Sequence, residues 1–184
     1  MPSEEAVLDR LRMDDTYRAL FVKAFPEAET ALTYDNMAEA IAAFERTLIT
    51  KDRFDDFQRG DNEALSDLEL KGLEIFTGIG CTTCHTGPLL GGGMYQKVGL
   101  VNPYENFSDL GREAVTKEED DRYKFKVPTL RNVAITGPYF HDGGVSTLNF
   151  AVRKMAYMQL GLELSTEQTE AIVAFLGALT DKSR

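Results

Sequence analysis

The sequence Cys81-Thr82-Thr83-Cys84-His85 holds both cysteines of this 184-residue chain and one of its two histidines. Cys-x-x-Cys-His is the attachment pattern of c-type haem. Thiols three positions apart can bond the two vinyl groups on one edge of the porphyrin, and the adjacent histidine can then bind the iron as its proximal ligand. Because three scarce residues rarely coincide at this spacing, the sequence predicts one covalently bound haem.

Two other kinds of site use a cysteine pair at this spacing. A tetrahedral zinc site could use Cys81, Cys84, His85 and His141, but His85 directly follows Cys84, and coordination of one ion by both is strained. A thioredoxin-like dithiol needs a strand before the motif and a helix that opens at the first cysteine. Here a helical pattern precedes Cys81, so haem is favoured over both alternatives.

The composition is that of an acidic globular protein. Lys and Arg number 20 against 30 Asp and Glu, a formal charge of −10, and a nucleic-acid partner is not expected because a phosphate-binding groove needs a basic surface. No stretch approaches ~18 apolar residues, so no membrane span is expected. The opening Met1-Pro2-Ser3-Glu4-Glu5 lacks the regions of a signal peptide, so export would require a leader that is not present in this chain.

Helical periodicity in the first third of the chain predicts two amphipathic helices. One is expected over residues 4–24, ended by Pro26, and the next is expected to be capped by Asp35 or Asn36. The highly charged residues 50–64 are interpreted as a linker or domain boundary.

The rest of the chain alternates between strong helix signals and a long irregular segment. Three helices are expected, opened by the caps Ser66 (with Glu69), Thr147 and Ser165 (with Gln168). Between His85 and Thr147, glycine and proline interrupt every periodic pattern, and no strand is supported. So long an irregular segment in a compact domain usually binds or wraps a ligand. The predicted fold class is mostly α.

The sixth iron ligand is His141, a methionine or nothing. Met155 and Met158 precede the last helix, where small c-type cytochromes place a distal methionine, whereas Met94 is too close to His85 to pass around the macrocycle. Met155 also lies on the apolar stripe of its helix, where a methionine more often fills the core. Residue spacing leaves the distal ligand open. Thioether ligation would favour ferrous iron and suit an electron carrier.

Several longer motifs resemble those of a known family. They are Phe125-Lys126-Val127-Pro128-Thr129-Leu130-Arg131-Asn132-Val133, Gly137-Pro138-Tyr139-Phe140-His141-Asp142-Gly143, Gly93-Met94-Tyr95-Gln96-Lys97, Asp109-Leu110-Gly111-Arg112, Thr33-Tyr34-Asp35-Asn36, Ala42-Ala43-Phe44-Glu45-Arg46-Thr47-Leu48 and Ile172-Val173-Ala174-Phe175-Leu176. Through them the chain resembles bacterial di-haem cytochrome c peroxidases over nearly its whole length.

The resemblance implies a cytochrome-c-like haem domain over residues 56–184, preceded by helices left from a peroxidatic domain over residues 1–55. In that family each of two such domains carries one haem. By motif match, Cys81, Cys84 and His85 attach the C-terminal, high-potential haem, and the distal methionine falls on Met155, ahead of Met158. This chain has one Cys-x-x-Cys-His where the family has two, so the resemblance places no catalytic residue of peroxide reduction in it. The chain is interpreted as a C-terminal piece of a longer protein.

The resemblance also implies partners and a second metal. Backbone carbonyls of Thr136 and Pro138 match part of a calcium site in the family. The expected electron donor is a small cytochrome c or cupredoxin, and the missing N-terminal haem domain is the expected electron acceptor. Homodimers are expected, through loops such as residues 110–120. Covalent haem attachment takes place outside the cytoplasm, so a periplasmic location is expected.

Arg131 and His141 each have two interpretations. Arg131 could contact a haem propionate, although a loop arginine is more often solvated. His141 could organise the route between two haems, or it could be a histidine hydrogen-bonded at a turn, because Asp142, Gly143 and Gly144 follow it.

Two functions remain open from the sequence. The first is the electron-transfer portion of a cytochrome c peroxidase that reduces hydrogen peroxide to water. The alternative is a stand-alone mono-haem electron carrier, which would also explain a single attachment motif.

Overall fold

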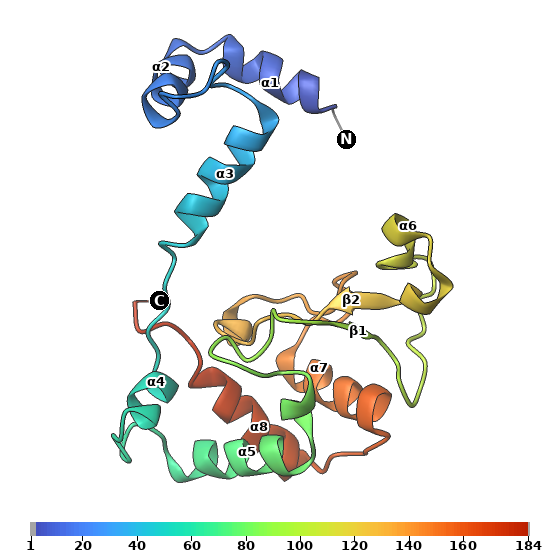
Figure 1. The fold of residues 1–184 in the computed structure, drawn as a ribbon. Helices are drawn as coiled ribbons and strands as arrows, with labels where there is room; N and C mark the ends of the chain where they lie inside the picture. Colours follow the sequence, from blue (N-terminus) through green and yellow to red (C-terminus); the bar gives the residue numbers. More distant parts are fainter. Residues whose placement is uncertain (1–2, 184) are drawn as a thin grey trace. The chain divides into compact units, whose positions relative to one another are not determined.

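The computed structural model describes residues 3–183, and it is mostly α-helical, as the sequence predicts. The chain forms two compact units, residues 1–49 and residues 50–184 (Figure 1). Among residues 3–183, no helix combines the length and the apolar character that crossing a bilayer requires.

The first unit contains three helices, α1 (Glu4–Arg12), α2 (Asp15–Ala24) and α3 (Tyr34–Glu45). The single helix expected over residues 4–24 is therefore wrong. Asp14 interrupts it, because its carboxylate accepts hydrogen bonds from the backbone N–H groups of Thr16 and Tyr17 and starts a new helix. Thr33, rather than Asp35 or Asn36, caps α3. Leu8, Phe21 and Leu32 form the small core of this unit.

The boundary between the two units falls at the start of the charged segment 50–64, and the segment itself belongs to the second unit rather than forming a free linker. It forms the short helix α4 (Arg53–Gln58), which starts at a capping box made by Asp52 and Asp55. Phe54 is buried in the core of the second unit, where its ring meets the Phe175 ring edge-on at 5.4 Å. The two compact units meet between residues 49 and 50, and one buried aromatic ring connects this charged segment to the larger core.

Two helices cross at the centre of the second unit, α5 (Asp67–Gly78) and α8 (Thr166–Gly177) (Figure 1). Both begin at the capping boxes that the sequence predicts. At the crossing, a methyl group on Gly72 would lie 1.9 Å from the carbonyl oxygen of Ala171, so only glycine permits this approach. The crossing holds the end of α5, and therefore the motif that follows it, against the main core.

The long segment between α5 and α7 (Leu148–Met155) is largely irregular, as expected, but it contains two short strands that the sequence did not reveal. β1 (Tyr95–Lys97) and β2 (Lys124–Lys126) pair antiparallel, with Gln96 opposite Phe125. Between the strands lies a one-turn helix, α6 (Glu113–Thr116). Thr147 caps α7 as predicted, and a π-helical turn, Ala156–Leu160, continues the helix directly.

Candidate haem-attachment site

The Cys-x-x-Cys-His sequence forms a tight turn at the end of α5. Gly80 adopts a left-handed conformation (φ 99°) that ends the helix, and Cys81–Thr83 form a 3-10 turn. The backbone N–H groups of Cys84 and His85 both donate to the carbonyl oxygen of Cys81, at 3.3 and 3.0 Å. These two hydrogen bonds close the turn, so Cys81, Cys84 and His85 are held within one tight turn of the backbone.

The imidazole of His85 is held in one orientation. Its Nδ1 lies 3.1 Å from the carbonyl oxygen of Leu90, which can only accept, so Nδ1 carries the proton. Burial lowers the pKa of His85 and favours the neutral ring. A histidine whose Nδ1–H is bound to a backbone carbonyl presents Nε2 as a metal ligand. His85 therefore has the tautomer that an axial iron ligand requires.

The two thiols are half-buried and form no disulfide. Burial raises the pKa of the Cys81 thiol to about 11, whereas the nucleophilic cysteine of a redox dithiol has a lowered pKa. The thioredoxin-like alternative is therefore disfavoured. Cys81 packs against the buried core of the second unit, as do the partly buried apolar side chains of Leu90, Val133, Leu148 and Val152. Two half-buried thiols that form no disulfide, an oriented imidazole and an apolar surrounding fit a covalently bound haem.

The turn that follows the motif depends on Gly91. Its backbone has φ 139°, and a methyl group there would lie 2.0 Å from the carbonyl oxygen of Pro128. Its N–H donates to the carbonyl oxygen of Thr86 at 2.9 Å, which closes the loop that carries Leu90. Sequence reasoning missed the role of Leu90 because the group that orients His85 is a backbone carbonyl; the only signal was the glycine run that begins at Gly91.

The zinc alternative has no support in the geometry. His141 stacks on Phe125, with ring centroids 3.9 Å apart, and it meets the Tyr104 ring edge-on at 5.5 Å. Within residues 3–183 there is no group of three or more His, Cys, Asp or Glu side chains placed to hold a metal ion.

The two candidate distal methionines have different surroundings. Met155 is the last residue of α7 and is half-buried. Met158 lies in the π-helical turn and is 1% exposed, so protein atoms already cover it. This difference in exposure indicates that Met158 fills the core and that Met155 has the more accessible thioether. The assignment of the distal ligand to Met155 remains a prediction.

Arg131 has protein partners rather than a solvated side chain. Its side chain is 8% exposed, it pairs with the fully buried Asp52, and its Nη2 lies 2.9 Å from an oxygen of Asp55. Nε and Nη2 also donate to the carbonyl oxygen of Pro88, at 3.0 and 2.9 Å. Arg131 thus links α4 to the loop after the haem motif. The contact with a haem propionate stays a prediction.

The turn around His141 is held by its neighbour Asp142. This carboxylate accepts from the Tyr104 hydroxyl at 2.9 Å, from Asn106 Nδ2 at 2.9 Å and from the N–H of Gly144 at 2.9 Å. The hydrogen bond from Asn106 contributes most to lowering the pKa of Asp142 to about 2. Burial, and then Asp142 itself, raises the pKa of Tyr104 to about 12. The turn is therefore hydrogen-bonded through Asp142, while His141 contributes ring contacts.

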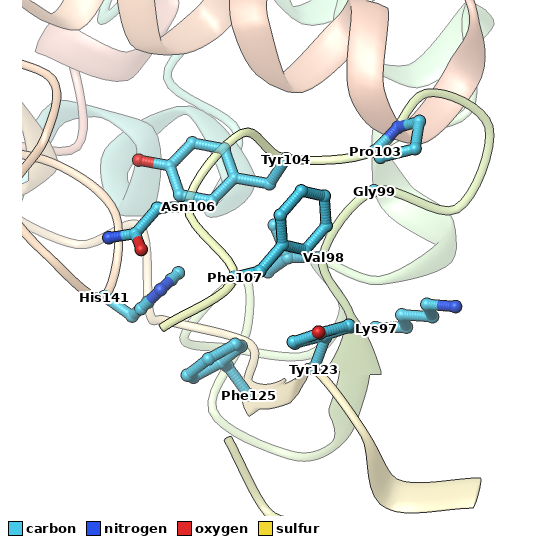
Figure 2. Close-up of a pocket in the computed structure, with 10 residues that line it drawn as sticks. All are labelled: Lys97, Val98, Gly99, Pro103, Tyr104, Asn106, Phe107, Tyr123, Phe125 and His141. Atoms are coloured by element: carbon cyan, nitrogen blue, oxygen red, sulfur yellow. The ribbon is translucent and has the colours of Figure 1, made fainter. Parts of the chain in front are cut away.

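An aromatic pocket lies beside this turn (Figure 2). The side chains of Tyr104, Phe107, Tyr123, Phe125 and His141 surround it. The two candidate calcium ligands, Thr136 and Pro138, lie outside this pocket in an exposed turn. Their metal-binding role stays a prediction.

Comparison with known proteins points to one family. A family model described as "Di-haem cytochrome c peroxidase" matches residues 1–63. The cytochrome c551 peroxidase of Nitrosomonas europaea is 48% identical over 166 residues, covering 89% of this chain and 49% of that protein. The cytochrome c551 peroxidase of Pseudomonas aeruginosa is 46% identical over 171 residues, covering 90% of this chain and 49% of that protein.

The fold comparison agrees with the sequence comparison. The crystal structure of a MauG-like protein associated with microbial copper homeostasis superimposes with a TM-score of 0.77 at 26% identity, covering 98% of this chain and 63% of that one. This chain spans about half the length of the two curated peroxidases, at 49% of each. With the Cys-x-x-Cys-His turn and the motifs around it, these matches show that the chain is related to the bacterial di-haem cytochrome c peroxidases, about half of whose length it matches.

Proposed function

We propose that this chain is the electron-transfer portion of a cytochrome c peroxidase and carries one c-type haem. The observation that supports the proposal is the turn at Cys81–His85, which carries two half-buried thiols that form no disulfide and an imidazole whose Nδ1 is bound to the Leu90 carbonyl. A bound haem supplies reversible one-electron chemistry between ferric and ferrous iron. Relatives named cytochrome c peroxidase support the role of the complete protein.

In this proposal each residue of the site has a separate task. Cys81 and Cys84 would hold the haem through thioethers, and His85 would bind the iron through Nε2. Met155 would supply a thioether ligand, which favours the ferrous state and a high reduction potential. With His85 and Met155 both bound, the haem iron would leave no position for peroxide. The chain would accordingly relay electrons from a small donor redox protein, while peroxide is reduced at a second haem of the complete protein.

The same proposal extends to location and assembly. Covalent haem attachment outside the cytoplasm implies a periplasmic protein. A small cytochrome c or cupredoxin is proposed as the donor, a homodimer as the assembly, and calcium as an additional ion near Thr136 and Pro138.

The distal ligand can be tested by two matched substitutions. Met155→Leu and Met158→Leu each keep an apolar side chain of similar volume and remove the sulfur, so both variants are expected to fold. We expect Met155→Leu to abolish the near-infrared band of methionine-ligated ferric haem and to let carbon monoxide bind the ferrous form. Met158→Leu is expected to leave the spectrum unchanged, because Met158 is core filler. Absorption spectra of both variants, ferric and ferrous, are the measurement. Loss of the band in Met158→Leu alone would transfer the ligand to Met158.

A further inference from the structure

One loop is hydrogen-bonded to the polypeptide that follows Met155, and the side chain of Gln159 makes three of these hydrogen bonds. We name residues 97–105 the clamp loop. The Oε1 atom of Gln159 accepts from the N–H groups of Gly99 and Leu100, both at 2.9 Å. Its Nε2 atom donates to the carbonyl oxygen of Lys97, also at 2.9 Å. One half-buried side chain thus makes three hydrogen bonds to the backbone of the clamp loop.

The clamp loop returns hydrogen bonds to the same turn. The N–H groups of Val101 and Asn102 donate to the carbonyl oxygen of Met158, at 2.9 and 3.1 Å. Asn102 Nδ2 donates to the carbonyl oxygen of Tyr157 at 2.8 Å. A π-helical turn shifts the hydrogen-bond register of the helix, so such turns need outside partners and often occur at functional sites. Here the clamp loop supplies those partners.

The same loop also contacts the residue before Met155. The Lys154 ammonium lies 2.8 Å from a carboxylate oxygen of Glu105 and 4.8 Å from the centroid of the Tyr104 ring. The Lys154 side chain is only 15% exposed. Tyr104 is in turn fixed by its hydrogen bonds to Asp142. The clamp loop, part of which is labelled in Figure 2, therefore ties the chain on both sides of Met155.

We propose that Gln159 is a positioning residue that holds Met155 in place for iron ligation. The proposal rests on the proposed function, because it takes Met155 as the distal ligand. A methionine has three rotatable side-chain bonds, so its sulfur stays on the iron only if the backbone that carries it is fixed. Gln159 fixes that backbone through the clamp loop, and its loss would let the end of α7 move away from the haem more often.

Competition with imidazole measures this effect directly. Added imidazole binds ferric iron only when the methionine sulfur has left, so its apparent affinity reports how often the distal position opens. We expect Gln159→Ala to raise the apparent affinity for imidazole about tenfold, the equivalent of one net hydrogen bond. Gln159→Glu keeps both acceptor interactions with Gly99 and Leu100 and loses the donor to Lys97, so we expect a smaller increase.

Gln168→Ala is the matched control. Gln168 also accepts a backbone hydrogen bond, from Ser165 at 2.9 Å, but it caps α8. The same substitution there removes a hydrogen bond from the helix cap without touching the clamp loop. We expect its affinity for imidazole to equal that of the unsubstituted protein.

The outcomes separate the two proposals. Met155→Leu serves as the reference in which the distal position is fully open. If Met155→Leu binds imidazole more tightly while Gln159→Ala stays within twofold of the unsubstituted protein, the positioning role is wrong and the ligand assignment stands. If Met155→Leu itself leaves the affinity unchanged, Met155 is not the ligand and both proposals are overturned. An equal rise in Gln168→Ala and Gln159→Ala would show general destabilisation and would also overturn the positioning role.

Discussion

Replacing Asp52 by alanine is expected to lower the free energy of unfolding of the second unit by about 3–5 kcal/mol. The Asp52 carboxylate is 0% exposed and pairs with Arg131, whose side chain is 8% exposed. Removing one partner of a buried ion pair leaves the other charge without compensation. Asp52 also accepts from the N–H of Asp55 at 3.0 Å, so the cap of α4 is lost as well. In this variant Asp55, 2.9 Å from Arg131, would still compensate part of the Arg131 charge. We therefore expect the loss of unfolding free energy to be near the lower end of the range, about 3 kcal/mol.

Urea unfolding of the full chain, followed by circular dichroism, measures this loss. Glu119→Ala is the control, because Glu119 is 87% exposed and lies 3.9 Å from Arg122, and an exposed pair of this kind contributes little to stability. The double variant Asp52→Ala with Arg131→Met should lose less unfolding free energy than the sum of the losses in the two single variants. The reason is that the second substitution removes the buried charge that the first leaves unpaired. A loss below about 1 kcal/mol in Asp52→Ala would contradict the structural role given to this pair.

Gly72→Ala is expected to destabilise the second unit by about 2–3 kcal/mol, in spite of the better helix propensity of alanine. The added methyl group would lie 1.9 Å from the Ala171 carbonyl oxygen and 2.9 Å from Phe175 Cβ. Ala171 and Phe175 are 0% exposed, so neither can move into solvent. The helices α5 and α8 would have to separate, and the haem motif at the end of α5 would move with them.

Gly78→Ala in the same helix is the matched control, because a methyl group there meets nothing within 4 Å. We expect it to be neutral, or more stable by up to about 1 kcal/mol through helix propensity. Thermal unfolding of both variants is the measurement. Equal stabilities for Gly72→Ala and Gly78→Ala would show that α5 and α8 do not cross as closely as the structure has them.

Local sequence signals predicted the second unit well where they were unambiguous. The capping boxes at Ser66 and Ser165 predicted the starts of α5 and α8, and Thr147 predicted the start of α7. Each of these caps acts through hydrogen bonds within three or four residues, so the adjacent sequence is sufficient to identify them.

The features that the sequence did not predict have two physical causes. Some depend on contacts between residues far apart in the sequence, and others on competition between local signals. Asp52 and Arg131 are far apart in the sequence, and only the fold reveals why a charged segment is buried. Asp14 ended a helix that the apolar periodicity alone would have continued. The strands β1 and β2 are only three residues each, too short for an alternating pattern to be recognised.

The candidate site divides in the same way. The haem-attachment role of the two cysteines and His85 is predicted from their spacing, because five adjacent residues contain all the groups that attachment requires. The groups that support them are the Leu90 carbonyl and the clamp loop bound by Gln159. They could not be predicted, since a backbone carbonyl and a glutamine carry no chemical signature in the sequence.

The central claim is that one haem is covalently attached through Cys81 and Cys84. Intact-mass spectrometry of the denatured full chain, produced in cells with a c-type haem maturation system, tests it most directly. We expect a mass equal to the polypeptide plus one haem, and the polypeptide mass alone for the Cys81→Ala, Cys84→Ala double variant. A chain without added mass under these conditions, or a double variant that keeps the haem, would contradict it.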